Sequence, residues 1–214
     1  MKKLESSLLN MVLVLTGVAV IMGAVLAFKN HLTSEPIAQQ QKKALDDGIK
    51  AVMACNELEV TRTDTVRQTD NKGKEQTFII YQTQDASHKE LGAAVESVSD
   101  GFGGKLRILV GFNPDGMILG YTLLEHAETP GLGAKADKWF QAGEKGSIVG
   151  KQPTKDSLLT VTKKAPETPY EVQAITASTI TSKAFILAVN NAYNAYKKTT
   201  ATDAQTGATE RIDN

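Results

Sequence analysis

An uncharged apolar run near the N-terminus limits the fold of this chain more than any other feature. Residues 8–28 include no Asp, Glu, Lys or Arg. A helix rises about 1.5 Å per residue, so about 20 residues cross the roughly 30 Å hydrocarbon core of a bilayer. Because no charge has to enter lipid, the run predicts one transmembrane helix, with the remainder of the chain folded outside the membrane.

A cleaved signal peptide is the alternative interpretation of this run. Signal peptides carry an apolar region of about 7–15 residues, followed by a cleavage site of small residues. The run here is longer, and it ends with Leu26, Ala27 and Phe28 before Lys29, which is a poor cleavage site. We therefore expect an uncleaved anchor.

Charged residues on either side of the run indicate its orientation. Lys2 and Lys3 precede it, whereas Lys29 and His31 follow it. Lys and Arg tend to remain on the cytoplasmic side of a membrane. The sequence therefore favours a cytoplasmic tail of residues 1–7 and a domain on the extracytoplasmic side.

Composition limits the class of protein. The chain has 214 residues, 41% of them apolar, and its formal net charge is zero. This length favours one globular domain with appendages, and without a basic field we expect no nucleic-acid partner. The single cysteine, Cys55, excludes an intramolecular disulfide. The histidines His31, His88 and His126 lack metal-ligand spacing, so no metal site is expected.

Hydrophobic periodicity predicts the elements that follow the anchor. A juxtamembrane helix is expected over residues 37–52, beginning at the Pro-containing segment 34–36. Strand patterns follow, and a helix with an apolar stripe ends the domain. The expected strands are 77–83, 93–98, 105–112, 117–125, 158–162 and 170–175, with a turn at 113–116, a short helix at 136–141 and the last helix at 182–198.

This pattern predicts an α+β protein with one N-terminal transmembrane helix and a single extramembrane domain, in which helices flank an antiparallel sheet. We divide the chain into the anchor 8–28, a juxtamembrane helix and first part of the domain at 29–99, a second part at 100–198, and a polar tail at 199–214.

Five hydroxyl side chains gather where the last helix begins. The first backbone N–H groups of a helix lack intrahelical partners, and the helix dipole favours an anion beside them. The cluster therefore predicts a phosphate site. Ordinary N-capping by one Ser or Thr explains the same composition, so both interpretations remain open. The residues are Thr176, Ser178, Thr179, Thr181 and Ser182.

A Gly/Pro loop lies upstream of this cluster. Proline restricts its own φ and the residue before it, and glycine lets a main chain approach a flat ligand closely. We expect one apolar contact from Leu132 and polar groups at the rim from Glu128 and Thr129. A tight turn without a ligand is the alternative. The loop consists of Glu128, Thr129, Pro130, Gly131, Leu132 and Gly133.

These two motifs resemble those of the FMN-binding domain family. The likeness runs from about residue 101 to residue 196, and it also includes the N-terminal anchor. Within that family the chain looks most like the G subunits of Rnf-type ferredoxin:NAD oxidoreductase complexes, and next like the C subunits of sodium-pumping NADH:quinone reductases. Its short length favours the G subunits. The matching segments are 101–104, 106–112, 126–133, Trp139, Phe140 and 176–179.

The resemblance implies a covalently held cofactor. In this family the last Thr of a Ser-Gly-Ala-Thr type motif carries FMN through a phosphoester, which a flavin transferase makes from FAD. That position is Thr179. Ala177 and Ser178 stand where Gly and Ala are more common, and Gln173 stands where Asp is common. The implied FMN site comprises Thr176, Ala177, Ser178, Thr179, Ile180 and Thr181, together with loop 128–133.

The implied function is that of a flavoprotein subunit in the bacterial inner membrane, in a complex that couples ferredoxin:NAD electron transfer to ion translocation. Its expected partners are the other subunits, the flavin transferase and membrane lipid. We expect no independent catalytic activity, since no acid–base constellation is indicated. The alternatives are a quinone-reductase C subunit, a stand-alone anchored flavoprotein for extracellular electron transfer, and an anchored binding module without a flavin.

Overall fold

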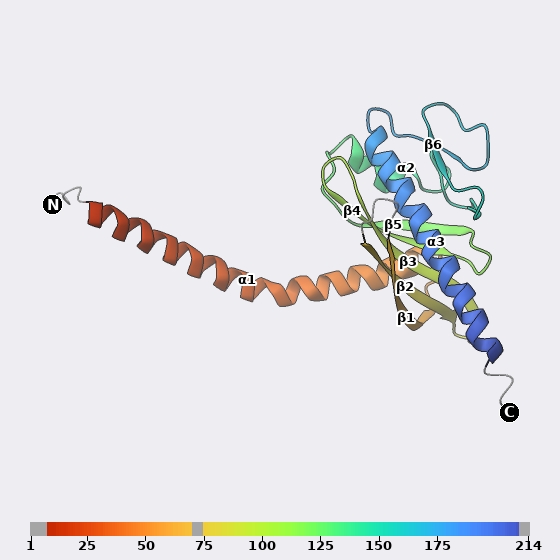
Figure 1. Ribbon diagram of the computed structural model, residues 1–214, viewed down its shortest axis with the longest axis horizontal. Coiled ribbons are helices and arrows are strands. Elements are labelled where there is room, and N and C mark those ends of the chain that lie inside the picture. Colours follow the sequence, from red (N-terminus) through yellow and green to blue (C-terminus); the bar gives the residue numbers. More distant parts are fainter. Residues whose placement is uncertain (1–7, 70–74, 210–214) are drawn as a thin grey trace. The chain divides into compact units, whose positions relative to one another are not determined.

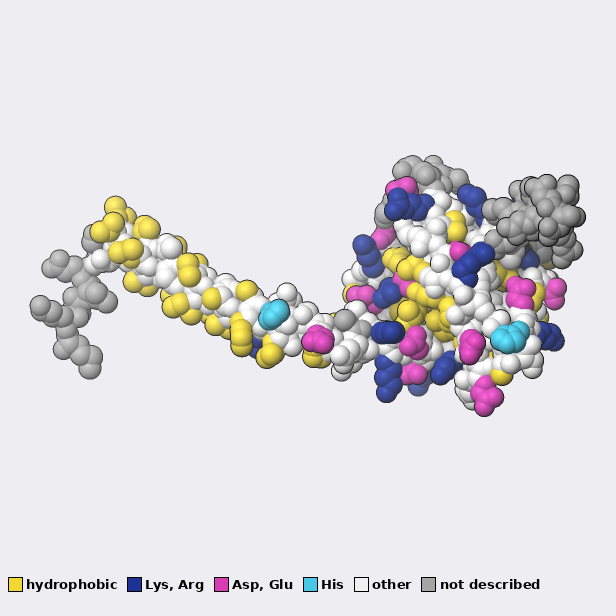
Figure 2. All heavy atoms as spheres, turned by 90° about the horizontal axis from the view of Figure 1, so that it is seen from below, with side chains coloured by type: hydrophobic (Ala, Val, Ile, Leu, Met, Phe, Trp, Pro, Cys, Tyr) yellow, Lys and Arg dark blue, Asp and Glu magenta, His cyan; other side chains and the backbone are white. Residues whose placement is uncertain are grey.

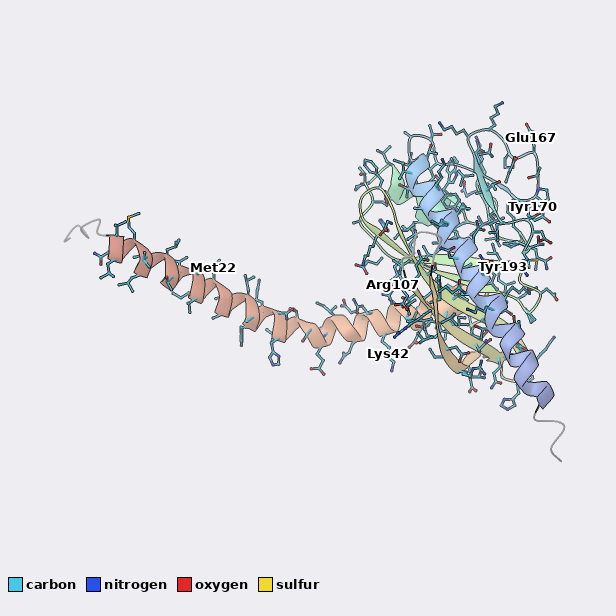
Figure 3. The ribbon with its side chains drawn as sticks, viewed as in Figure 1. Met22, Lys42, Arg107, Glu167, Tyr170 and Tyr193 are labelled. Atoms are coloured by element: carbon cyan, nitrogen blue, oxygen red, sulfur yellow. The ribbon has the colours of Figure 1, made fainter. Side chains whose placement is uncertain are left out.

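The computed structural model describes residues 8–69 and 75–209, so the predicted tail 1–7 and the segment 210–214 lie outside the described residues. The chain forms two compact units that divide after Ala44, and each is considered by itself. The first is the N-terminal part of helix α1 (Leu8–Val52). Within the described residues, α1 alone is long and apolar enough to cross a membrane. Its apolar side chains, including Met22, project outward (Figures 2 and 3).

Helix α1 continues through Pro36, where the sequence predicts the start of a new helix. A proline inside a helix removes one intrahelical hydrogen bond and crowds the carbonyl four residues earlier. The Gln and Lys residues that follow Pro36 are good helix formers. They support an unbroken helix as readily as a new one, so the proline alone does not set a boundary.

The second unit is built on a five-stranded antiparallel sheet in the order β1-β2-β3-β4-β5 (Figure 1). Every strand follows its neighbour in sequence, so the sheet is a meander. This confirms the predicted α+β class. The strands are β1 (Leu58–Thr69), β2 (Glu75–Asp85), β3 (Glu90–Asp100), β4 (Lys105–Phe112) and β5 (Ile118–His126).

The turn between β4 and β5 forms where the sequence predicts it. Asn113 Oδ1 accepts a hydrogen bond from Met117 N at 2.8 Å. Gly116 has a φ of 91°, a left-handed conformation that glycine adopts without a steric cost. The hairpin thus carries β5 into His126 and the Gly/Pro loop.

Residues between β5 and the last helix contain little regular structure. The predicted short helix 136–141 is found as α2 (Ala136–Trp139), which directly follows the 3-10 helix η1 (Gly133–Lys135). The two predicted strands shrink to β6 (Thr160–Thr162) and β7 (Glu171–Gln173). These pair in parallel with each other in a separate two-stranded sheet, so they do not extend the antiparallel one.

Helix α3 (Thr179–Thr209) packs on one face of the main sheet. It begins three residues before the predicted start at Ser182 and continues past the predicted end at Lys198. The core on this face is rich in aromatic contacts: Phe112 stacks on Tyr196 with ring centroids 5.5 Å apart, and Phe140 stacks on Phe185 at 4.2 Å. This core fixes the start of α3 relative to the sheet.

The opposite face of the sheet is covered by the last turns of α1. Ile49, Val52 and Met53 form a second core there with Leu109. A Cβ added to Gly111 would overlap the carbonyl oxygen of Val52, so the helix end lies directly against the backbone of β4.

The same face carries a charged pair, which includes Arg107 (Figure 3). Arg107 Nε donates to Glu96 Oε1 at 2.6 Å and its Nη2 donates to Glu96 Oε2 at 2.9 Å. Glu96 is 7% exposed. Both oxygens of this buried carboxylate are therefore satisfied, as a buried charge requires.

Candidate functional site

The N-terminus of α3 offers unpaired donors. Ser182 N donates to Ser178 O at 3.0 Å, which is the first hydrogen bond of the helix. The N–H groups of Thr179, Ile180 and Thr181 precede it, and among the described residues nothing accepts a hydrogen bond from them. A helix start of this kind attracts an anion.

The hydroxyl cluster does not cap this helix end. Ser182 Oγ accepts from Ile175 N at 2.9 Å and donates to Ser178 O at 2.9 Å. Thr181, which is 1% exposed, donates its hydroxyl to Glu128. Thr179 is half-buried, and within the described part of the chain its hydroxyl has no hydrogen-bond partner. Simple N-capping therefore does not explain the cluster, and Thr179 keeps an available oxygen.

The turn before α3 brings the chain into the helix through a left-handed residue. Ala177 has a φ of 63°, and Ser178 N donates to Ile175 O at 3.0 Å. For a residue with a Cβ, a left-handed conformation is disfavoured by roughly 1–2 kcal/mol. This turn exposes Ala177 and Thr176 and leads directly to Thr179.

Glu128 lies inside the protein and not at the rim of the loop, where its sequence context predicts it. It is 6% exposed. Its Oε1 accepts hydrogen bonds from Phe102 N at 2.7 Å and Gly103 N at 3.2 Å. Its Oε2 accepts from Thr181 Oγ1 at 2.8 Å. The expectation fails because a sequence gives the type of a side chain but not the direction in which it points.

A pocket of about 360 Å³ lies over these contacts. Its size falls within the roughly 300–1,000 Å³ of small-molecule sites. Three large apolar side chains around it are partly or largely exposed: Phe102 at 70%, Leu132 at 42% and Ile180 at 58%. The pocket thus combines apolar walls with a free hydroxyl and unpaired N–H groups. Its lining residues are Phe102, Glu128, Thr129, Leu132, Gly133, Ala177, Ser178, Thr179, Ile180 and Thr181.

Known proteins resemble this chain over the same region and beyond it. The FMN-binding domain family model matches residues 101–194. The G subunit of the proton-translocating ferredoxin:NAD(+) oxidoreductase complex of Clostridium ljungdahlii is 30% identical over 178 residues, which cover 83% of this chain and 85% of that protein. The G subunit of the ion-translocating oxidoreductase complex of Aliivibrio fischeri is 32% identical over 196 residues, covering 86% and 88%. The chain belongs to this family of G subunits.

The fold of the G-family chain is also similar to that of a solved structure. The crystal structure of NqrC from Shewanella oneidensis gives a TM-score of 0.55 at 16% identity, and the match covers 73% of this chain and 93% of that one. At this identity the likeness concerns the fold. It agrees with the α+β arrangement described above.

The G-family chain brings most of its predicted site residues together. Residues 177–181 and Glu128, Thr129, Leu132 and Gly133 line one pocket. Pro130 and Gly131 instead line a neighbouring hollow of about 390 Å³ beside Trp139. Thr176 is exposed and does not line the pocket either.

Phe102, which lines the pocket, and Gly103, which contacts the pocket residue Glu128, are absent from the predicted site of the G-family chain. Their backbone N–H groups bind Glu128, and the Phe102 side chain lines the pocket. The Gly-rich run 101–104 is the sequence feature that could have pointed to these residues. Its Gly103 is required because a Cβ there would overlap the carbonyl oxygen of Ala127. Glycine there lets two loops approach each other closely.

A larger hollow of about 670 Å³ lies elsewhere on the G-family domain. Strands β1 and β2 line it together with Tyr196 and Thr200 near the other end of α3. It contains none of the predicted site residues and lacks an exposed helix N-terminus. We therefore place the functional site in the smaller pocket, which contains the Thr179 hydroxyl and the helix N-terminus.

Proposed function

We propose that this chain is the membrane-anchored, flavin-carrying electron-transfer subunit of an Rnf-type ion-translocating ferredoxin:NAD oxidoreductase complex. Its relatives and its FMN-binding domain support the electron-transfer role, and the apolar part of α1 supports the anchor. The finer proposal is a covalent bond between FMN and Thr179. The proposal rests on the Thr179 hydroxyl and the three N–H groups beside it in the pocket wall, for which the described residues provide no hydrogen-bond partner.

Thr179 enters the bond through its side-chain oxygen. With FAD presented by a flavin transferase, Thr179 Oγ1 forms a bond to the phosphorus of the FMN half, and the P–O bond to the AMP half breaks. AMP leaves, the hydroxyl proton passes to solvent, and no electron is exchanged. The resulting phosphodiester carries one negative charge at the positive end of the α3 dipole. Lys183 is exposed one helical turn later and adds a positive charge nearby.

Bound flavin supplies the electron-transfer chemistry, and the protein supplies its position and surroundings. Phe102, Leu132 and Ile180 offer apolar surface to a flat ring. The buried carboxylate of Glu128 orders the pocket wall from behind. No general acid or base is required for this role.

The proposed location follows from the anchor and its flanking charges. Residues 8–28 span the inner membrane, with the N-terminus in the cytoplasm and the flavin domain, residues 100–198, on the extracytoplasmic side. A covalent bond retains the cofactor in a compartment where free FMN is not replenished. The proposed partners are the other complex subunits, the flavin transferase and membrane lipid.

Substitution of the acceptor tests this function. We expect Thr179→Ala to abolish the flavin fluorescence of the chain in a denaturing gel and the FMN increment in its intact mass. The domain should stay folded, because loss of a hydroxyl at a helix start costs about 1 kcal/mol or less. Thr176→Ala is the matched control and should keep both signals. Wild-type chain from native membranes without flavin would contradict the covalent bond.

A further inference from the structure

We infer that Glu128 is a positioning residue for the attachment site: its carboxylate holds the first turn of α3 and the 101–104 turn in the geometry that presents Thr179. This inference rests on the proposed function, because it concerns the same acceptor. It assigns Glu128 to the protein framework and not to the cofactor.

The hydrogen bonds of Glu128 join three separate segments. Oε1 binds the backbone N–H groups of Phe102 and Gly103, in the turn between β3 and β4. Oε2 binds the hydroxyl of Thr181, in the first turn of α3. The carboxylate itself belongs to the Gly/Pro loop after β5. One carboxylate therefore links the three segments directly.

Two glycines make room for the carboxylate. A Cβ on Gly101 would overlap Glu128 Oε1, and a Cβ on Gly133 would overlap Glu128 Oε2. Neither glycine needs a left-handed φ at this place. Close approach of Glu128 therefore explains why both positions lack a side chain.

The link reaches Thr179 through a short path. Thr181 is 1% exposed and lies two residues after Thr179, within the same helical turn. Fixing the Thr181 side chain fixes the direction of that turn, and with it the Thr179 oxygen and the unpaired N–H groups. Transfer reactions depend steeply on such alignment, with a displacement of about 1 Å costing up to about a hundredfold in rate.

The test uses the full-length chain produced with and without its flavin transferase. The variants are Glu128→Ala, Glu128→Gln and Thr181→Val. Glu96→Gln is the matched control, because Glu96 is similarly buried but pairs with Arg107, and neither residue lines the pocket. Flavin incorporation is followed over time by intact mass, and backbone hydrogen exchange is measured on the flavin-free chain.

We expect Glu128→Ala to incorporate flavin between about tenfold and a hundredfold more slowly than wild type. Hydrogen exchange at residues 101–104 should accelerate in the flavin-free variant, because the Phe102 and Gly103 amides lose their acceptor. Glu128→Gln keeps one acceptor oxygen and should be partly rescued. Thr181→Val should slow incorporation while leaving exchange at 101–104 unchanged. Glu96→Gln should incorporate flavin at the wild-type rate.

Wild-type incorporation rates in both Glu128→Gln and Thr181→Val overturn the inference, even if Glu128→Ala fails to fold. Equal slowing by Glu96→Gln also overturns it, because the effect would then follow general stability. A wild-type chain that carries no flavin overturns the proposed function itself. In that case the exchange measurement on the flavin-free chain still reports whether Glu128 orders the 101–104 turn.

Discussion

Ala177 adopts a conformation that suits glycine better. Its φ of 63° lies in the left-handed region, where a Cβ meets the following carbonyl oxygen. The residue is exposed, so no buried contact compensates this strain. The family resemblance places glycine more commonly at this position, which agrees with the conformation found here.

Replacement of Ala177 by Gly is expected to stabilise the domain. Relief of the strain outweighs the larger chain entropy of glycine in the unfolded state, for a net gain of about 0.5–1 kcal/mol. Urea denaturation of the flavin-free chain measures this change. Ala54→Gly, at a φ of 52° far from the site in sequence, should gain a similar amount. Ala142→Gly, an exposed alanine outside the left-handed region, should lose stability, and a gain there would contradict the strain argument.

Residue types were more predictable than side-chain directions. The hydroxyl cluster and Gly/Pro loop are visible as strings of residues, and most of their members line one pocket. Glu128 is the counterexample, because the sequence places it at the rim and the structure buries it. Its partners Phe102 and Thr181 lie far away along the chain, and a single sequence carries no sign of that pairing.

Strands with a regular apolar alternation were predicted well from the sequence, whereas the edge strand β1 was not. Strand β4 has the predicted bounds because one side of it is uniformly apolar. Strand β1 was missed, since it is an edge strand with polar and charged residues on both faces, such as Asp64 on one and Arg67 on the other. Edge strands commonly carry charges that discourage pairing with other chains. Such residues hide the alternation that identifies a strand.

Helix α3 shows the same limit at both of its ends. Its apolar stripe, with Phe185, Val189 and Tyr193 buried against the sheet, marks the middle of the helix. The ends lie in hydroxyl-rich segments that favour caps and turns as much as helix. Packing against the sheet, which the sequence does not reveal, decides where the helix starts.

Because α1 contacts the backbone of β4, a single methyl group added at Gly111 should lower the stability of the domain. Gly111→Ala places a Cβ against the Val52 carbonyl, so the helix end must move away from the sheet. We expect a loss of about 2–3 kcal/mol in the free energy of unfolding, as for an overpacked core. Gly120→Ala is the graded control: its Cβ would lie 3.1 Å from the same oxygen, and its cost should be smaller. Equal costs in urea denaturation would contradict this packing.

The domain as a whole is expected to lose stability at alkaline pH. Burial raises the pKa of Tyr196 from 10.0 to about 12, and burial also raises the pKa values of Tyr81 and Tyr121. A raised pKa means that the folded state retains the proton more tightly. This stabilisation is fully present below pH 10 and is lost as pH rises from 10 toward 12.

Tyr196→Phe tests this pH dependence. The variant loses the hydrogen bond from the Tyr196 hydroxyl to Asn113 O, which costs about 1 kcal/mol at neutral pH. It also loses the ionisable group, so its stability should fall less steeply than that of wild type above pH 10. Urea midpoints measured between pH 8 and about pH 11 compare the two slopes. Parallel curves would mean that Tyr196 does not contribute.

The segments that meet at Glu128 are distributed over most of the domain: the 101–104 turn, the loop after β5 and the first turn of α3. A partly synthesised chain that lacks helix α3 contains the strands of the main sheet but not Thr179, which begins that helix. Under the proposed function, FMN can therefore be attached to Thr179 only after helix α3 has been synthesised and has packed on the sheet. A flavin bound to this residue would then report that the whole domain has been synthesised and folded.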